Sequence, residues 1–375
     1  MTKKTQIIAY FGVYFSLGAI IASLGPTLPA LAQNVQAGIA AISILFTTRS
    51  LGYLSGSLLG GYLYDHYNGH HIIALMLTLS AAFFAAVPKM HGLFWLAALF
   101  FFLGINLGGL DVGANTLVTR TRKKNVGPYL NAMFFFAGLG GFLTPLYLGA
   151  VNLAWSYYGI ALFLLLLAVW VFFSPAPEIA PHTETKKIRL ENTLPFIAFT
   201  LLAFLFIGAE TSYGGWLFTY FRNSGLGNEK AAYTLTSVFW LSVMFGRLLA
   251  IPIASRFRLD KIIIVYLIGA TLNAAILFFL RENSLAVWIG SIGMGFSIAA
   301  LFPSTYTLIQ QKMHLSGKLT GIVWAMGSLG AMFIPWFIGQ EIDARGPASM
   351  MLIMLVVWIL ALGIFLAALR APTET

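Results

Sequence analysis

The sequence predicts an all-α membrane protein in which 12 transmembrane helices form two pseudo-symmetric six-helix bundles. Of the 375 residues, 59% are hydrophobic and 9% are charged, whereas about a quarter of the residues of a soluble domain carry a charge. Apolar segments of about 20 residues, the length that crosses a bilayer core, recur along the whole chain. Parts of the first half also recur in the second half at a constant spacing, which indicates a duplication.

The apolar segments are expected to be helices, because a lone strand would leave backbone hydrogen-bonding groups unpaired in hydrocarbon. The longest interruption, 175–192, is rich in Pro, Glu, Lys and Thr. We interpret it as a cytoplasmic linker between a first bundle at 1–174 and a second bundle at 193–375. The predicted helices cover about 6–31, 38–64, 71–88, 93–118, 127–150, 154–174, 194–221, 229–255, 261–280, 285–309, 318–340 and 347–369.

The basic residues lie at alternate ends of the predicted spans. If the N-terminus is cytoplasmic, 15 of the 22 Lys and Arg residues fall on the cytoplasmic side, and only Arg49 and Arg247 lie within spans. The remaining five, on the outer side, are Lys89, Arg222, Lys230, Arg281 and Arg345. This positive-inside pattern predicts that both termini are cytoplasmic. The net charge of +10 therefore does not indicate nucleic-acid binding, and the short loops favour a bacterial inner membrane.

Glycine and proline residues mark the internal repeat at an offset of 190 residues. The matched pairs are Gly18 with Gly208, Gly25 with Gly215, Gly56 with Gly246, Gly140 with Gly330, Pro145 with Pro335, and Gly149 with Gly339. Glycine lets membrane helices approach closely, and proline bends them. Two six-helix halves related by an axis along the membrane normal are typical of transporters that work by alternating access.

Two acids, Asp111 and Glu210, are predicted to lie inside spans, while the other ten Asp and Glu residues lie in loops, at span ends or in the tail. A charge at bilayer depth is costly, so an intramembrane acid is by default a candidate functional residue. The repeat places Leu301 opposite Asp111 and Ile20 opposite Glu210, so the fold itself does not require the acids. We expect them to bind a coupling cation or proton; the alternative is that each acid joins two helices.

Other polar and aromatic residues in the spans are candidates for substrate binding. Asn115 lies four residues after Asp111 and therefore on the same helix face. Arg49 is expected either to pair with an acid or to contact substrate. The remaining candidates each carry an amide, a hydroxyl or a flat aromatic ring of the kind that sugar sites use. These candidates are Asn106, Asn131, Tyr213, Trp216, Trp240, Asn273 and Trp324. The alternative for the aromatic residues is that they face lipid or neighbouring helices.

In the loop between the second and third spans, Asp65 and Gly69 keep the places that they have in the loop signature of the major facilitator superfamily, which this segment resembles. The resemblance implies that Asp65 locks the inner gate, and Arg247 is expected to have a gating or structural role. His66, His70 and His71 lie in the same loop and are interpreted as solvated side chains, because no acid cluster accompanies them to form a metal site. The chain has no cysteine, which excludes disulfides, thiol nucleophiles and zinc–thiolate sites.

Four segments resemble one branch of a known family. The segment 49–68 is similar to helix two of the sodium-dependent glucose transporters. The segments 109–116, 208–216 and 246–250 are similar to helices four, seven and eight of these transporters and of the fucose, glucose and galactose symporters. Both groups belong to the major facilitator superfamily. The resemblance implies a sugar or sugar-like substrate that moves with a cation. Proton-coupled members carry an acid in helix one, whereas the span 6–32 has none. Sodium coupling, or proton coupling through Asp111 or Glu210, therefore stays open.

We therefore expect a secondary active transporter that binds a small polar solute, such as a sugar, between its halves and works by alternating access. The expected partners are the solute, a coupling H⁺ or Na⁺ and the lipid bilayer, with no other cofactor, no nucleic acid and a monomeric state. One alternative is an exporter of drugs, lipids or other metabolites on the same fold, and another is a non-transporting sensor. An enzyme is not expected, because the sequence has no metal-ligand spacing, nucleophile motif or soluble catalytic domain.

Overall fold

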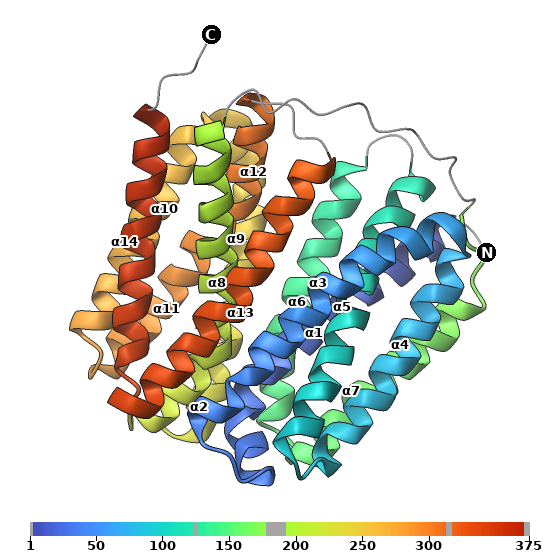
Figure 1. The fold of residues 1–375 in the computed structure, drawn as a ribbon, viewed down its shortest axis with the longest axis horizontal. Helices are drawn as coiled ribbons and strands as arrows, with labels where there is room; N and C mark the ends of the chain where they lie inside the picture. The colour runs from blue at the N-terminus through green and yellow to red at the C-terminus, as the bar shows by residue number, and fades with distance from the viewer. Residues whose placement is uncertain (1–2, 123–125, 178–192, 313–316, 371–375) are drawn as a thin grey trace. The chain divides into compact units, whose positions relative to one another are not determined.

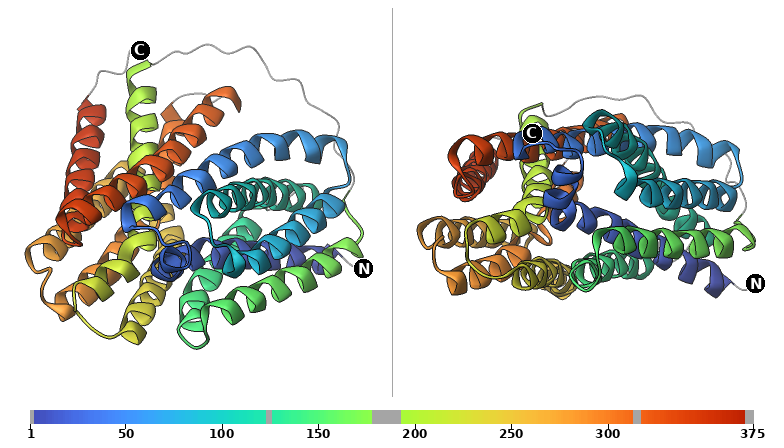
Figure 2. Two further views of the ribbon diagram at one scale, coloured as in Figure 1. Left: turned by 60° about the horizontal axis from the view of Figure 1, so that its bottom comes forward. Right: turned by 90° about the horizontal axis from the view of Figure 1, so that it is seen from below.

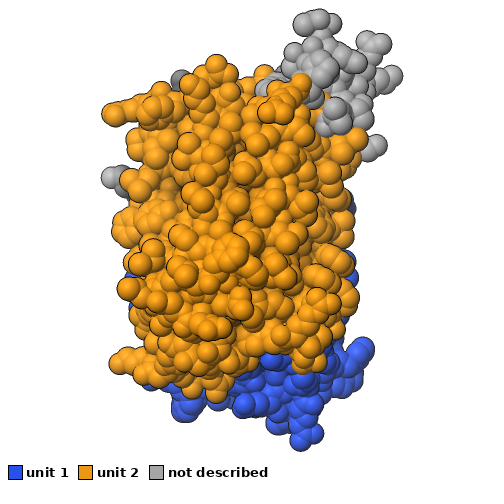
Figure 3. All heavy atoms as spheres, turned by 90° about the vertical axis from the view of Figure 1, so that its left-hand side faces the viewer, with its two compact units in different colours: residues 1–182 blue, residues 183–375 orange. Residues whose placement is uncertain are grey.

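The computed structural model describes residues 3–122, 126–177, 193–312 and 317–370, and every regular element in these ranges is a helix. The chain divides into two compact units, residues 1–182 and 183–375, coloured separately in Figure 3 and called here the first and second bundles. Most of the predicted linker, 178–192, lies outside the described residues. Within them, 11 helices are long and apolar enough to cross a membrane. The predicted span not counted among these is the one that carries Arg49 and Asp65.

In the first bundle, the long helices pack in neighbouring pairs (Figures 1 and 2). Its elements are α1 (Lys3–Asn34), α2 (Ile39–Ile42), α3 (Ile44–His66), α4 (Gly69–Ala86), the 3₁₀ turn η1 (Val87–Lys89), α5 (Leu93–Thr121), α6 (Gly127–Leu148) and α7 (Leu153–Phe172). The helix α3 packs along α5, α1 along α6, and α4 along α7. The helix α1 also contacts α5, so side chains from α1, α3 and α5 can meet inside this bundle.

The second bundle repeats the main helix pairing of the first, although its broken span is a different one. Its elements are α8 (Thr193–Asn223), α9 (Glu229–Arg256), α10 (Leu259–Phe279), α11 (Ser284–Ile298), α12 (Leu301–Lys312), α13 (Gly317–Arg345) and α14 (Ser349–Arg370). The helix α8 packs along α13 as α1 packs along α6, and α11 contacts both α9 and α10.

The matched glycines make equivalent contacts in the two bundles. A Cβ atom added to Gly140 of α6 would lie 2.1 Å from the carbonyl oxygen of Phe15 in α1. A Cβ atom added to Gly330 of α13 would lie 2.0 Å from the carbonyl oxygen of Phe204 in α8. Both glycines thus allow two helix backbones to touch, which is the role that the repeat predicted for them.

Four helices begin at an asparagine that caps their first turn. The side-chain oxygens of these residues accept hydrogen bonds from backbone N–H groups that have no partner within the helix. The capping residues are Asn68 for α4, Asn152 for α7, Asn228 for α9 and Asn283 for α11. These polar caps fix where each span begins.

Two of the predicted continuous helices are broken in the structure. The predicted span 38–64 consists of α2 and α3, which meet at Ser43. The hydroxyl of Ser43 donates a hydrogen bond of 2.6 Å to the carbonyl of Ala40, and this bond competes with the regular backbone bonds of a helix. The predicted span 285–309 consists of α11 and α12, separated at Ala299 and Ala300. Pro303 explains this second break, because proline has no N–H to donate to the carbonyl four residues earlier, and its ring clashes with that carbonyl.

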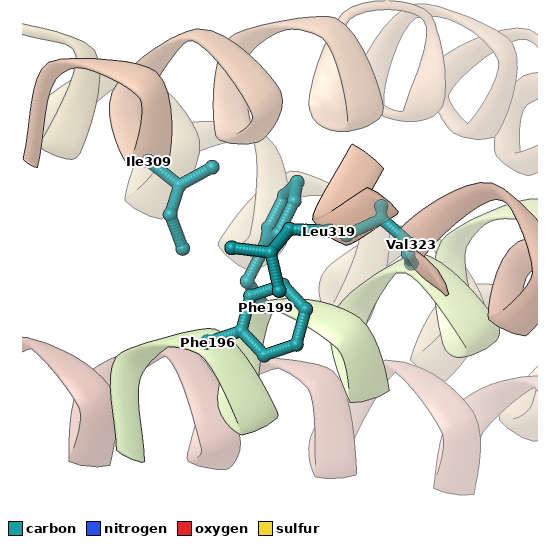
Figure 4. Close-up of a cluster of buried hydrophobic side chains, with 6 residues drawn as sticks. Phe196, Phe199, Ile309, Leu319 and Val323 are labelled. Carbon is teal, nitrogen blue, oxygen red and sulfur yellow. The ribbon is translucent and has the colours of Figure 1, made fainter. Parts of the chain in front are cut away.

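The helix α12 is held by its own apolar cluster after the break (Figure 4). Ile309 of α12 belongs to a buried group of side chains from α8 and α13. The other members are Phe196, Phe199 and Ala203 of α8, and Leu319 and Val323 of α13. The two halves of this span share α10 as a packing partner but differ in the other one, which is α9 for α11 and α8 for α12.

Candidate functional site

Asp111 lies in the middle of α5 and is surrounded by hydroxyl and amide groups. The hydroxyl of Tyr14 in α1 donates to its Oδ1 at 2.7 Å, and the hydroxyl of Tyr53 in α3 donates to its Oδ2 at 2.5 Å. Nδ2 of Asn115 lies 3.1 Å from Oδ1 and 2.5 Å from the Tyr14 hydroxyl oxygen. Three helices thus meet at one half-buried carboxylate.

Within the described ranges, Asp111 forms no ion pair with a Lys, Arg or His side chain. Its partners are neutral, so the group carries an uncompensated charge whenever it is ionised. Carboxylate, hydroxyl and amide oxygens are the ligands that hard cations prefer, and a carboxylate can also take up a proton. The group of Asp111, Tyr14, Tyr53 and Asn115 is called the Asp111 site below.

Glycines on α5 bring Tyr53 to this acid. A Cβ atom added to Gly104 would lie 2.1 Å from the carbonyl oxygen of Arg49, and a Cβ atom added to Gly108 would lie 2.1 Å from the carbonyl oxygen of Tyr53. The backbones of α3 and α5 therefore touch just before Asp111. Sequence analysis identified Asp111 and Asn115 but missed both tyrosines. The available signal was weak: Tyr14 precedes a repeat glycine by four residues and Tyr53 precedes one by three.

Arg49 does not pair with Asp111. Its side chain is buried, its Nη1 donates to the carbonyl of Ile21 at 3.4 Å, and its guanidinium lies 5.9 Å from the centre of the Phe46 ring. Asn106 is buried on α5 with its Nδ2 unpartnered in the described part of the chain, whereas Asn131 on α6 is exposed. None of these three side chains forms a hydrogen bond to Asp111 among the described residues.

Asp65 binds a neighbouring helix of its own bundle. Its Oδ1 lies 3.0 Å from Nη2 of Arg120 at the end of α5, and Nη1 of Arg120 donates to the carbonyl of Tyr64 at 2.7 Å. The pair fastens the end of α3 to the end of α5. A gating role for Asp65 stays a prediction.

Glu210 of α8 forms an ion pair with Arg247 of α9. Nη2 of Arg247 lies 2.8 Å from Oε1 of Glu210, and the two side chains are 27% and 25% exposed. Nε of Arg247 donates to the carbonyl oxygen of Ala299 at 3.4 Å, at the break between α11 and α12. The two intramembrane acids thus differ in their electrostatic environment, because Glu210 has a cationic partner.

Two aromatic candidates next to Glu210 are fully buried. The hydroxyl of Tyr213 lies 2.7 Å from the hydroxyl oxygen of Ser291 in α11. The indole N–H of Trp216 donates to the carbonyl of Pro335 in α13 at 2.8 Å. In this structure both rings connect α8 to neighbouring helices of the second bundle rather than facing solvent.

The other three candidates of the second bundle lie in different surroundings. Trp240 packs on Gly214, and its buried Nε1 has no hydrogen-bond partner within the described chain. Nδ2 of Asn273 donates to the carbonyl of Gly269 at 2.7 Å, so this amide satisfies its own helix. Trp324 is 43% exposed and packs edge-on against Phe302.

His70 is buried, so the prediction that it is a solvated loop residue is wrong. Its Nδ1 lies 2.8 Å from the carbonyl oxygen of Ser174 and its Nε2 lies 2.9 Å from the hydroxyl of Tyr10. Because a carbonyl only accepts, Nδ1 carries the proton and the Tyr10 hydroxyl donates to Nε2 of the neutral ring. Gln6 Nε2 donates to the carbonyl of Pro175 nearby. The sequence placed His70 in a loop, whereas Asn68 caps α4 and starts that helix one residue before it.

Comparisons with known proteins agree with this architecture. Sodium-dependent glucose transporter 1 of Xenopus laevis is 31% identical over 356 residues, which cover 85% of this chain and 72% of that protein. The human protein of the same name is 29% identical over 371 residues, covering 87% of this chain and 71% of that protein. The fold also matches solved structures of a D-xylose–proton symporter (TM-score 0.79, 14% identity, 99% and 98% of the two chains) and of the nucleoside transporter NupG (TM-score 0.77, 12% identity, 99% and 100%).

The model of one family covers most of the sequence, with a match over residues 7–335. The predicted all-α membrane fold and the predicted family are confirmed by this match and by the solved structures. This multi-pass membrane protein is a member of the Major Facilitator Superfamily.

Proposed function

We propose that the protein is a secondary active transporter that moves a sugar or sugar-like solute by alternating access, coupled to Na⁺ or H⁺ at Asp111. The names of its relatives support a sugar and sodium, and the family supports transport. The charge pattern supports cytoplasmic termini.

The observation that carries this proposal is the Asp111 site. An ionised carboxylate inside a span is costly unless it is paired, neutralised or hydrated. Asp111 is surrounded by oxygen-bearing side chains from three helices and, among the described residues, has no basic partner. A bound cation or proton would balance its charge. Glu210 stays a second predicted coupling residue, but its pairing with Arg247 makes Asp111 the stronger candidate.

Coupling follows if the cation changes which conformation is favoured. A ligand shifts a conformational equilibrium only when it binds the two states differently. The ligands at Asp111 come from α1, α3 and α5, so relative movement of these helices would change the number of oxygens around a cation. Asn115 is proposed to contact the cation or the solute, since its amide already touches both Asp111 and Tyr14.

The decisive experiment is uptake into proteoliposomes that contain the purified protein. Labelled hexoses, pentoses and deoxyhexoses are offered with an inward Na⁺ gradient, an inward H⁺ gradient or neither. We expect accumulation above the outside concentration with one of the two gradients. Uptake of lipids or drugs that sugars do not compete with would favour the exporter, and ligand binding without counterflow for any solute would favour the sensor.

The two tyrosines of the Asp111 site provide a test of the coupling ion. We expect Tyr53→Phe and Tyr14→Phe to raise the Na⁺ concentration for half-maximal uptake at least about tenfold, because each removes an oxygen that contacts a charged group, worth about 1.5–3 kcal/mol. If the ion is H⁺, the same variants remove donors that stabilise the ionised carboxylate, so half-maximal uptake would shift to higher pH. The control is Tyr62→Phe, an exposed position on the same helix as Tyr53; equal behaviour of Tyr62→Phe and Tyr53→Phe would contradict the assignment.

A further inference from the structure

At the break between α11 and α12, the carbonyl of Ala299 loses its usual partner because of a proline. In a continuous helix the N–H of residue 303 would donate to the carbonyl of Ala299. Residue 303 is proline, which has no N–H. The next carbonyl, that of Ala300, accepts from the N–H of Ser304 at 2.9 Å, so the regular pattern resumes one residue later.

Arg247 supplies a donor to this carbonyl. Its Nε lies 3.4 Å from the Ala299 oxygen, and the preceding residue, Gly246, allows α9 to approach, since an added Cβ would lie 2.6 Å from Cβ of Ala299. A cation near the C-terminus of a helix, here α11, also interacts favourably with the helix dipole. Non-helical backbone at membrane depth needs partners of this kind.

Glu210 holds the guanidinium in this position. It pairs with Nη2 of Arg247 at 2.8 Å, while Nε of the same side chain faces Ala299. The acid therefore balances the charge of Arg247 inside the span and fixes its orientation. Arg247 thus connects α9 to α8 through the ion pair, and to the junction of α11 with α12 through the hydrogen bond to Ala299.

The first bundle serves as an internal comparison. At the repeat offset of 190 residues, Pro303 corresponds to Gly113, Arg247 to Ser57, and Glu210 to Ile20. There the equivalent helix α5 runs without interruption from Leu93 to Thr121. The proline, the arginine, the acid and the break therefore occur together in the second bundle, and none of the four is found at the corresponding described positions of the first.

We propose that Arg247, oriented by Glu210, is a positioning residue: it donates to the carbonyl of Ala299 the hydrogen bond that Pro303 cannot donate. The helices α11 and α12 then act as two separate elements with a hinge between them. The hinge contributes to the conformational step of transport; this part rests on the function proposed above. The separate packing of α12 on the cluster around Phe199 is consistent with a unit that moves independently of α11.

The capping role is tested by a double-mutant cycle on the full-length protein in detergent, with the thermal unfolding midpoint as the readout. Arg247→Met is expected to lower the midpoint in the natural background and to lower it much less in Pro303→Ala, whose new N–H can reach Ala299. Arg345→Met is the control, because Arg345 forms an exposed ion pair with Glu341 and should have the same effect in both backgrounds. Equal losses for Arg247→Met in the two backgrounds would overturn the capping role.

The hinge is tested by uptake kinetics of the same variants. Arg247→Met and Pro303→Ala are each expected to lower the maximal rate severalfold with little change in substrate affinity, and Arg247→Lys to retain more rate than Arg247→Met. A wild-type rate in Pro303→Ala would overturn the hinge. If Arg247→Met does not fold, Glu210→Gln and Arg247→Lys give the same cycle. The stability cycle needs no substrate, so its outcome is independent of whether the transported solute is a sugar.

Discussion

Replacing Asp111 by asparagine is expected to abolish concentrative uptake while equilibration of the solute continues. The variant keeps the shape of the side chain but removes the negative charge that a coupling ion would neutralise. A membrane potential of 100 mV supplies about 2.3 kcal/mol per charge moved, which corresponds to roughly fiftyfold accumulation of a neutral solute. In Asp111→Asn this accumulation should fall to the level without a gradient.

Counterflow in the absence of an ion gradient separates loss of coupling from loss of folding. Asp111→Asn is expected to exchange labelled for unlabelled solute, because exchange needs no net driving force. Asp260→Asn is the matched control, since Asp260 pairs with the exposed Arg258 at the start of α10. Concentrative uptake by Asp111→Asn at the wild-type level would refute the assignment of the coupling site.

The second large effect is expected for Gly56→Ala, which should strongly destabilise the first bundle. An added Cβ at Gly56 would lie 1.9 Å from the carbonyl oxygen of Ile105, so α3 and α5 must separate. Overpacking of this kind costs about 1–3 kcal/mol or more. The same separation would move Tyr53 away from Asp111, so both the unfolding midpoint and the ion affinity should fall.

Gly61→Ala is the natural control, because Gly61 lies on the same helix and a Cβ there would meet no atom within 4 Å. Alanine also favours helix over glycine by about 1 kcal/mol, so Gly61→Ala should be neutral or stabilising. A similar loss of stability in both variants would show that the close contact of Gly56 with α5 does not cause the destabilisation.

The sequence was sufficient for the all-α membrane fold and the repeat, because both follow from composition and spacing. The matched pair Gly140 and Gly330 illustrates this, since each makes the close helix contact that its repeat position predicted. The break at Ala299 was missed although Pro303 was visible. Membrane helices often tolerate proline, so only the position of Arg247 shows how this helix responds to it.

The site was predictable only in part, because which side chains meet depends on how the helices pack. Two acids and two arginines within spans allowed several pairings, and the sequence could not choose between them. The structure pairs Glu210 with Arg247 and surrounds Asp111 with Tyr14 and Tyr53. The tyrosines lie far from Asp111 in the sequence, and their spacing from the repeat glycines does not indicate which side chain they contact.

The buried contacts of His70 and Gln6 affect how this chain can be cut. The carbonyl groups of Ser174 and Pro175 bind these two side chains, so the segment just after α7 is part of the first bundle. Reporter insertions, protease sites and split versions for separate expression should therefore be placed downstream of Pro175. A fragment that stops at Phe173 would leave the imidazole of His70 buried without its acceptor.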